Sequence, residues 1–167
     1  IIMAFSRQDT ECMALALKLS KKGRASVGAN PMVGCVITRD DKIISQDYHR
    51  EYGKSHAEVN ALDQIKHQGK GTKLYVTLEP CSHQGKTPPC TKALIKAGIK
   101  NVVVAMPDPN PMVSGRGMKL LKDAGIEIDI GLLQNEVMEL NRGFIKRMET
   151  GMPFVTTKIA MSFDGGT

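Results

Sequence analysis

The sequence KLYVTLEPCSHQGKTPPCTKALIKAGIKNVVVA occupies residues 73–105 and contains two apolar segments on either side of a helical one. The apolar segments, residues 73–78 and 101–105, are rich in β-branched side chains and have the length of buried strands. Residues 88–97 between them are predicted to form a helix that ends at Gly98, because glycine is common just after a helix. Strand, helix and strand in this order predict a parallel pair of strands in an α/β fold.

The same alternation continues on both sides of this unit. A predicted helix over residues 117–124 and a strand over residues 126–130 are joined through Gly125, in an Ala-Gly-Ile junction like the one at Gly98. The other expected elements are a helix over 8–22 capped by Ser6, Asp9 or Thr10, strands over 32–38 and 42–48, a helix over 56–68 capped by Ser55, and a helix over 135–150. Together they predict a layered α/β domain over residues 1–150.

The character of the sequence changes after Gly151. Residues 153–159 have the pattern of a further strand, with little sequence after them to form a partner. We therefore expect a boundary after residue 150, with residues 151–167 as a linker and the first strand of a second domain. A simple C-terminal tail fits the same residues.

The composition is that of a globular protein without a membrane span. The chain of 167 residues is long enough to bury the core of one domain, and 41% of its residues are hydrophobic. No apolar run approaches the ~20 residues that cross a bilayer, and the apolar start is too short for a signal peptide. We therefore expect a cytoplasmic protein with no membrane partner, whose four cysteines are metal ligands or buried thiols rather than disulfides.

The net charge of +6 suits an anionic partner. The basic residues, however, are scattered singly along the chain, and no aromatic residues alternate with them as stacking platforms for nucleic acid bases. Solvated helix faces therefore explain these charges better than a nucleic-acid surface does. A small phosphorylated substrate needs only one or two of them. The sequence leaves homo-oligomerisation open.

Four residues have the types and the order of a catalytic zinc site, three as metal ligands and one as a carboxylate. His56 and Glu58 stand in the sequence H-A-E, Cys81 follows a proline, and Cys90 comes after eight further residues. His56, Cys81 and Cys90 are predicted metal ligands, and three protein ligands leave a tetrahedral Zn²⁺ one open position for a catalytic water. Glu58 is the predicted catalytic proton shuttle to a departing amino nitrogen. Zinc deaminases of nucleobases carry such motifs, although with two residues between the cysteines.

Other interpretations fit part of this pattern. A structural zinc site needs a fourth ligand, for which His83 is available, and would belong to a basic RNA-binding module. A deaminase of cytosine nucleotides or of RNA bases would share the zinc motifs, but the long loop with Lys86 between the cysteines is evidence against it. Cys12 and Cys35 lie in apolar segments and are predicted core residues.

Longer motifs resemble those of the pyrimidine deaminases of riboflavin biosynthesis. They are HAEVNAL at residues 56–62, TLEPCSH at residues 77–83 and GKTPPC at residues 85–90. The gap of eight residues between the cysteines is typical of that group. NPMVG at residues 30–34, PDPNP at residues 107–111 and GRG at residues 115–117 extend the resemblance over essentially the whole chain.

The resemblance implies a three-layer α/β/α, cytidine-deaminase-like fold with a mixed, mostly parallel five-stranded sheet. It implies a hydrolase with one zinc ion per chain that removes the 2-amino group of 2,5-diamino-6-ribosylamino-4(3H)-pyrimidinone 5′-phosphate to give 5-amino-6-(5-phosphoribosylamino)uracil. Similar enzymes are often bifunctional, fused to an oxidoreductase domain that uses NADPH. Residues 153–165 resemble the start of that domain, so we expect a deaminase followed by a truncated reductase that does not itself use NADPH.

The resemblance also implies a set of substrate contacts, which are Asn30, His49, His83, Lys86, Asp108 and Asn110. An amide can donate to and accept from the edge of a pyrimidine, and Lys86 or a protonated histidine can face a phosphate. Turn formation is the alternative for Asn30, Asp108 and Asn110. A plain surface histidine is the alternative for His49.

Overall fold

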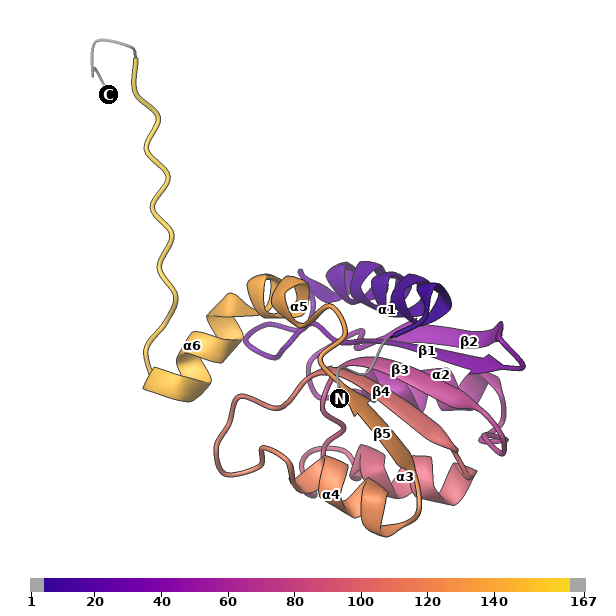
Figure 1. Cartoon of the computed structure of the whole chain (residues 1–167). Helices are drawn as coiled ribbons and strands as arrows, with labels where there is room; N and C mark the ends of the chain where they lie inside the picture. The colour runs from indigo at the N-terminus through magenta and orange to yellow at the C-terminus, as the bar shows by residue number, and fades with distance from the viewer. Residues whose placement is uncertain (1–4, 163–167) are drawn as a thin grey trace.

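The structure is a computed structural model that describes residues 5–162, and it contains a mixed sheet between two layers of helices (Figure 1). In that range the strands are β1 Gly34–Arg39, β2 Lys42–Tyr48, β3 Lys73–Leu78, β4 Asn101–Met106 and β5 Glu127–Ile130, in the order β2-β1-β3-β4-β5. The helices are α1 Arg7–Ser20, α2 Ala57–Gln64, α3 Cys90–Ala97, α4 Arg116–Asp123, α5 Gln134–Leu140 and α6 Arg142–Thr150, with the 3-10 helix η1 Lys21–Gly23 after α1. Helices α1 and α5 cover one face of the sheet, and α2, α3 and α4 cover the other.

The pairing of the strands divides the sheet into two halves. Strands β3, β4 and β5 are parallel, as the alternation of strands and helices predicted. Strand β1 is antiparallel to both β2 and β3. It is joined to β2 by Asp40 and Asp41, whose φ values of 47° and 62° are those of a tight hairpin turn. The predicted mixed sheet in a three-layer α/β/α fold is confirmed.

Helix α2 differs from its predicted form at both ends. Its N-cap is His56 rather than Ser55, and the carbonyl of Ser55 instead accepts a hydrogen bond from the side chain of Asn60. The helix ends at Gln64, before the predicted residue 68, because Lys66 and His67 have positive φ values and turn the chain away.

The single helix predicted over residues 135–150 is two helices, α5 and α6, because Asn141 interrupts it. The amide of buried Asn141 accepts a hydrogen bond from the N–H of Met32 at 2.8 Å and donates one to the carbonyl of Met32 at 3.1 Å. These two bonds fix the junction of the helices against the loop before β1. They join residues that lie 109 positions apart, so helical periodicity gives no sign of them.

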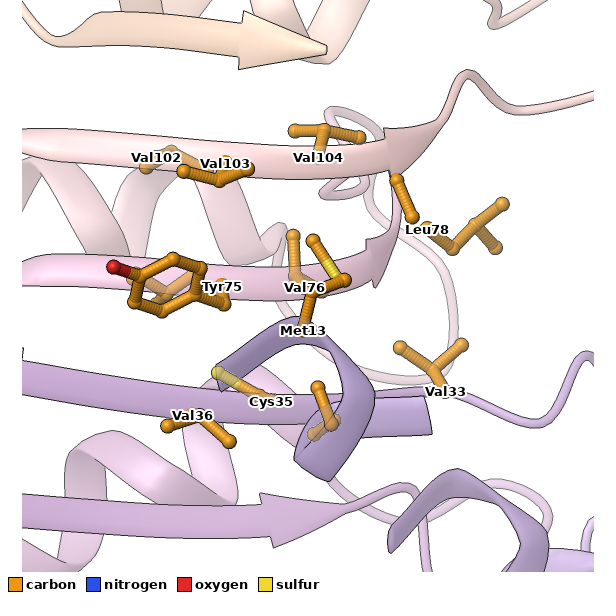
Figure 2. Packing of buried hydrophobic residues seen from close by; sticks show 14 of the residues in the cluster. Met13, Val33, Cys35, Val36, Tyr75, Val76, Leu78, Val102, Val103 and Val104 are labelled. Carbon is orange, nitrogen blue, oxygen red and sulfur yellow. The ribbon is translucent and has the colours of Figure 1, made fainter. Parts of the chain in front are cut away.

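The hydrophobic core lies against the central strands. Figure 2 shows Met13 of α1 against Cys35 of β1 and Val76 of β3. Cys12 and Cys35 are buried and form no disulfide, in agreement with their predicted place in the core. None of the helices within residues 5–162 combines the length and the hydropathy of a transmembrane span.

Residues 152–162 have no regular secondary structure and run away from the domain (Figure 1). The strand predicted over residues 153–159 is therefore not formed in the described chain, since a strand needs a neighbour for its backbone hydrogen bonds. The ring of Phe154 lies against α6, 4.6 Å from the guanidinium carbon of Arg142. The domain boundary after residue 150 stays a prediction, and residues 163–167 lie outside the described residues.

The carboxylate of Asp9 connects α1 to the sheet. It accepts hydrogen bonds from the ammonium group of Lys73 at 2.6 Å and the hydroxyl of Tyr75 at 2.8 Å. It also accepts one from the backbone N–H of Ser6, as part of a capping box at the start of α1. Burial acts to raise the pKa of Asp9, but these hydrogen bonds outweigh it and hold the pKa well below its usual range.

Replacement of Asp9 by Asn is expected to lower the free energy of unfolding by about 1–3 kcal/mol at neutral pH, because Lys73 loses its anionic partner. The folded-state pKa of Asp9 lies well below its unfolded value, so this contribution is fully present at neutral pH and declines as the pH falls from about 4 towards the folded-state pKa. Urea denaturation at neutral pH and at about pH 3 measures the effect.

Glu11→Gln is the matched control for Asp9→Asn. Glu11 is exposed and pairs with Arg7, which is also exposed, so its replacement is expected to change the stability by less than about 0.5 kcal/mol. Equal effects of the two replacements, or an effect of Asp9→Asn that does not change with pH, would show that the Asp9 network does not stabilise the fold.

Candidate active site

The three predicted metal ligands converge beside the end of β3. The Nδ1 atom of His56 is 3.5 Å from Sγ of Cys81 and 3.3 Å from Sγ of Cys90, and the three ligand atoms all lie within 4.8 Å of one another. A tetrahedral zinc site with Zn–S of about 2.3 Å and Zn–N of about 2.0 Å separates its N and S ligand atoms by about 3.5 Å. One imidazole and two thiolates also favour zinc over magnesium or calcium. Both the spacing and the donor set fit a zinc ion.

Two helices direct their N-termini at this group. His56 is the N-cap of α2, and Cys90 is the first residue of α3. The backbone N–H of Cys90 donates a hydrogen bond to Sγ of Cys81 at 3.2 Å. Hydrogen bonding by the Cys90 thiol lowers the pKa of Cys81 to about 4, and the same bond raises the pKa of Cys90. The partial positive charge of both helix N-termini favours the thiolates that a metal requires.

His83 does not complete the group as a fourth ligand. It is exposed, and it is absent from the set of mutually close metal-binding atoms in the described chain. Structural zinc sites are closed by four protein ligands, whereas catalytic sites keep a position open. Three converging ligands therefore favour the catalytic alternative.

Glu58 lies in the first turn of α2 with its side chain buried. Burial raises the pKa of Glu58 to about 7, although the nearby imidazole of His56 opposes the rise. A carboxyl group with this pKa can both accept and release a proton near neutral pH.

A pocket of about 370 Å³ opens beside the metal group, and His56, Glu58 and Cys81 line it. This volume is in the range of sites for small molecules. All the residues predicted to contact the substrate line the same pocket, namely Asn30, His49, His83, Lys86, Asp108 and Asn110. Cys81 and Asp108 follow the carboxyl ends of the parallel strands β3 and β4, where open α/β sheets commonly bind their ligands.

His49 is buried, so it is not a plain surface histidine. Its Nδ1 atom lies 3.1 Å from the carbonyl oxygen of Ser55, and its ring meets the ring of His56 edge to face, with centroids 5.4 Å apart. Burial lowers the pKa of His49. The neutral imidazole is therefore favoured, and because its Nδ1–H donates to the carbonyl of Ser55, its Nε2 atom remains as a hydrogen-bond acceptor.

Asp108 and Asn110 both form turns and line the pocket. The carboxylate of Asp108 accepts a hydrogen bond from the N–H of Asn110 at 2.8 Å, and the amide oxygen of Asn110 accepts one from the N–H of Met112 at 3.0 Å. Such local bonds are typical of Asn and Asp in turns. Turn formation and a place in the site therefore do not exclude each other.

Glu79, which is not among the predicted site residues, organises the loop after β4. Its buried carboxylate accepts hydrogen bonds from four backbone N–H groups, those of Asp108, Gly115, Gly117 and Met118. A side chain at position 117 would not fit, because its Cβ atom would lie 2.1 Å from the carbonyl oxygen of Pro80. Glu79 thus holds the loop of Asp108 against the end of β3. In the sequence, the position of Glu79 directly before the Pro-Cys motif is the feature that points to a role near the site.

Two further features of the pocket wall were not predicted: the contact of Lys86 with Tyr52, and the residues that α6 contributes. The ammonium group of Lys86 lies 3.9 Å from the centroid of the Tyr52 ring, so a cation–π contact joins two loops at the rim. Phe144, Arg147 and Met148 reach the pocket from α6. The pattern of α6 predicted a helix that closes the domain, and it contains no motif that marks these residues.

Comparison with known proteins agrees with the geometry of the site. The family described as "Cytidine and deoxycytidylate deaminase zinc-binding region" matches residues 6–106. Riboflavin biosynthesis protein RibD of Escherichia coli (strain K12) is 51% identical over 160 residues, which are 96% of this chain and 44% of that protein. Diaminohydroxyphosphoribosylamino-pyrimidine deaminase of Buchnera aphidicola subsp. Schizaphis graminum is 49% identical over 146 residues, which are 87% of this chain and 99% of that protein.

A solved structure of Acinetobacter baumannii RibD superposes with a TM-score of 0.92 and 52% identity, over 95% of this chain and 45% of that chain. The chain thus spans less than half the length of the E. coli and A. baumannii proteins, but it matches almost the whole Buchnera protein. The family match and the nearly complete coverage of the Buchnera protein show which family this is. The chain belongs to the cytidine and deoxycytidylate deaminase family, among its diaminohydroxyphosphoribosylaminopyrimidine deaminases.

Proposed function

We propose that this chain is a zinc-dependent hydrolase that deaminates 2,5-diamino-6-ribosylamino-4(3H)-pyrimidinone 5′-phosphate to 5-amino-6-(5-phosphoribosylamino)uracil, a step of riboflavin biosynthesis. The observation that carries the proposal is the pocket, which His56, Cys81 and the buried Glu58 line and which opens beside the group of three metal-binding side chains. The name of the Buchnera protein, matched over nearly its whole length, supports this substrate class.

Each polar group at the base of the pocket has a role in this proposal. His56, Cys81 and Cys90 hold the zinc ion, which supplies Lewis acidity to the pocket. Glu58 takes a proton from the attacking water and delivers it to the 2-amino nitrogen, so that ammonia rather than an amide anion leaves. The pKa of Glu58, raised to about 7 by burial, suits both transfers.

The six predicted substrate contacts hold the substrate in this proposal. Asn30 offers a donor and an acceptor, and His49 an acceptor, for the edge of the pyrimidine, and Asp108 and Asn110 offer acceptors for the ribose hydroxyls and the ring amines. Lys86 offers an ammonium group and His83 an imidazole N–H at the exposed side of the pocket, where a phosphate would remain partly hydrated.

We propose also that residues 151–167 are the linker and the first strand of an NADPH-dependent reductase domain. This proposal is supported by the solved Thermotoga maritima protein, which is named a deaminase and 5-amino-6-(5-phosphoribosylamino)uracil reductase and of which this chain covers 43%. NADPH would serve that domain rather than the pocket described above. The cytoplasmic location stays a prediction, and homo-oligomerisation stays open.

Ammonia release tests the assignment of the substrate. The purified, zinc-assayed chain is offered the diaminopyrimidinone phosphate, cytidine and deoxycytidine monophosphate in separate reactions. Release from the first alone is the expected result. Release from a cytosine nucleotide would instead favour a cytidine or deoxycytidylate deaminase, and silence on all three with zinc bound would favour a structural site.

A further inference from the structure

Arg147 of α6 brings a guanidinium group to the wall of the pocket and is not among the predicted site residues. Its Nη2 atom donates a hydrogen bond to the carbonyl of Ala29 at 2.8 Å. Its Nε atom is buried and has no hydrogen-bond partner, and it is alone in this among the buried side-chain nitrogens and oxygens of residues 5–162. A buried donor of a charged group that lacks a partner is costly, so this N–H marks a position where a ligand atom is expected.

The guanidinium is held in place by its surroundings. The bonds between Asn141 and Met32 fix the start of α6 to the loop before β1, and the bond from Arg147 to Ala29 fixes a later turn of α6 to the same loop. Ala29 directly precedes Asn30, another residue of the pocket wall. Because the side chain is already oriented, little of its freedom would be lost when a ligand binds.

The charge of Arg147 has no carboxylate partner among the described residues. The acidic groups that line the pocket are engaged elsewhere. Glu79 accepts four backbone N–H groups, Asp108 accepts the N–H of Asn110, and Glu58 lies beside the metal ligands. A planar guanidinium without a carboxylate partner is suited to a phosphate, which it can bind through two parallel N–H···O bonds.

We infer that Arg147 is a further substrate-binding residue, one that receives the phosphate group of the substrate and makes the pocket selective for the phosphorylated compound. The inference rests on the proposed function, because the phosphate is the anionic group of that substrate. Lys86, stacked on Tyr52 at the rim, provides a second cation for the same group.

Arg147→Gln tests the inference when phosphorylated and dephosphorylated substrates are compared. The variant is expected to lose about tenfold to a hundredfold in kcat/KM for the phosphorylated diaminopyrimidinone, because it loses a charged hydrogen bond. It is expected to change by less than about threefold on the form without phosphate. Arg142→Gln is the matched control: Arg142 is exposed on the same helix, pairs with Glu139 and does not line the pocket. Zinc content and melting temperature are measured for all variants.

Three results would overturn the inference. Equal losses on both substrates would mean that Arg147 supports the loop of Asn30, and an unchanged kcat/KM would mean that it does not contact the substrate. The third result comes from calorimetric titration with ribose 5-phosphate, which needs no turnover. Binding of equal strength to the wild type and to Arg147→Gln would show that Arg147 does not contact the phosphate. A wild-type chain that binds ribose 5-phosphate through Arg147 but releases no ammonia would refute the proposed reaction and leave the phosphate contact standing.

Discussion

Glu58→Gln is expected to bind one zinc ion per chain and to lose at least about 100-fold in turnover of the diaminopyrimidinone phosphate. The amide has nearly the shape of the carboxyl group, so the buried position in the first turn of α2 is filled as before. It cannot take a proton from water at neutral pH, however, and so it cannot pass one to the departing nitrogen. Zinc is determined by mass spectrometry and turnover by ammonia release.

The control for this variant is Glu51→Gln, in an exposed residue of the loop before α2 that does not line the pocket. It is expected to keep both its zinc and its rate. A zinc-loaded Glu58→Gln protein with a near-normal rate would remove Glu58 from the mechanism. Loss of zinc together with the rate would show instead that Glu58 acts on the metal group.

Cys90→Ser is expected to lose at least about 100-fold in zinc affinity, and its activity with it. Cys90 is fully buried at the start of α3, and its Sγ atom lies 3.3 Å from Nδ1 of His56. A serine hydroxyl is shorter, is not deprotonated at neutral pH and is a poor ligand for zinc. Competition with a chromophoric chelator measures the affinity of both proteins.

Cys12→Ala is the matched control for the loss of zinc, because Cys12 is a buried cysteine of the core outside the metal group. It is expected to bind zinc as the wild type does, with a small loss of stability from the missing sulfur atom. Full zinc occupancy in Cys90→Ser would show that the ligand set is wrong, and His83 would then be the first alternative to test.

The sequence predicted the boundaries of those elements that neighbouring residues determine. Strands β2 and β3 begin and end at the predicted residues, because short runs of strand-forming residues end at clear turn signals there. The break between α5 and α6 could not be predicted, since it depends on hydrogen bonds from Asn141 to Met32 in a distant loop. The strand over residues 153–159 has the composition of a strand but no neighbour to pair with in the described chain.

The metal group could be predicted because its residue types are few and their order is characteristic. His56 and Cys90 stand at helix starts and Cys81 follows a strand, so the predicted α/β topology brings them to one end of the sheet. Residue type and order do not mark Glu79 or Arg147, although Glu79 stands directly before the Pro-Cys motif. Their partners are backbone groups from other parts of the chain, and a carboxylate or guanidinium looks in sequence like any surface charge.

The most direct test of the account is one reaction of the purified, zinc-loaded chain with the diaminopyrimidinone phosphate in water enriched in heavy oxygen. Zinc-dependent hydrolysis predicts one ammonia released for each product formed, with the new carbonyl oxygen of the product carrying the heavy isotope. No ammonia from a chain with one bound zinc ion, or a product without the isotope, would contradict the assignment of this pocket as a hydrolytic deaminase.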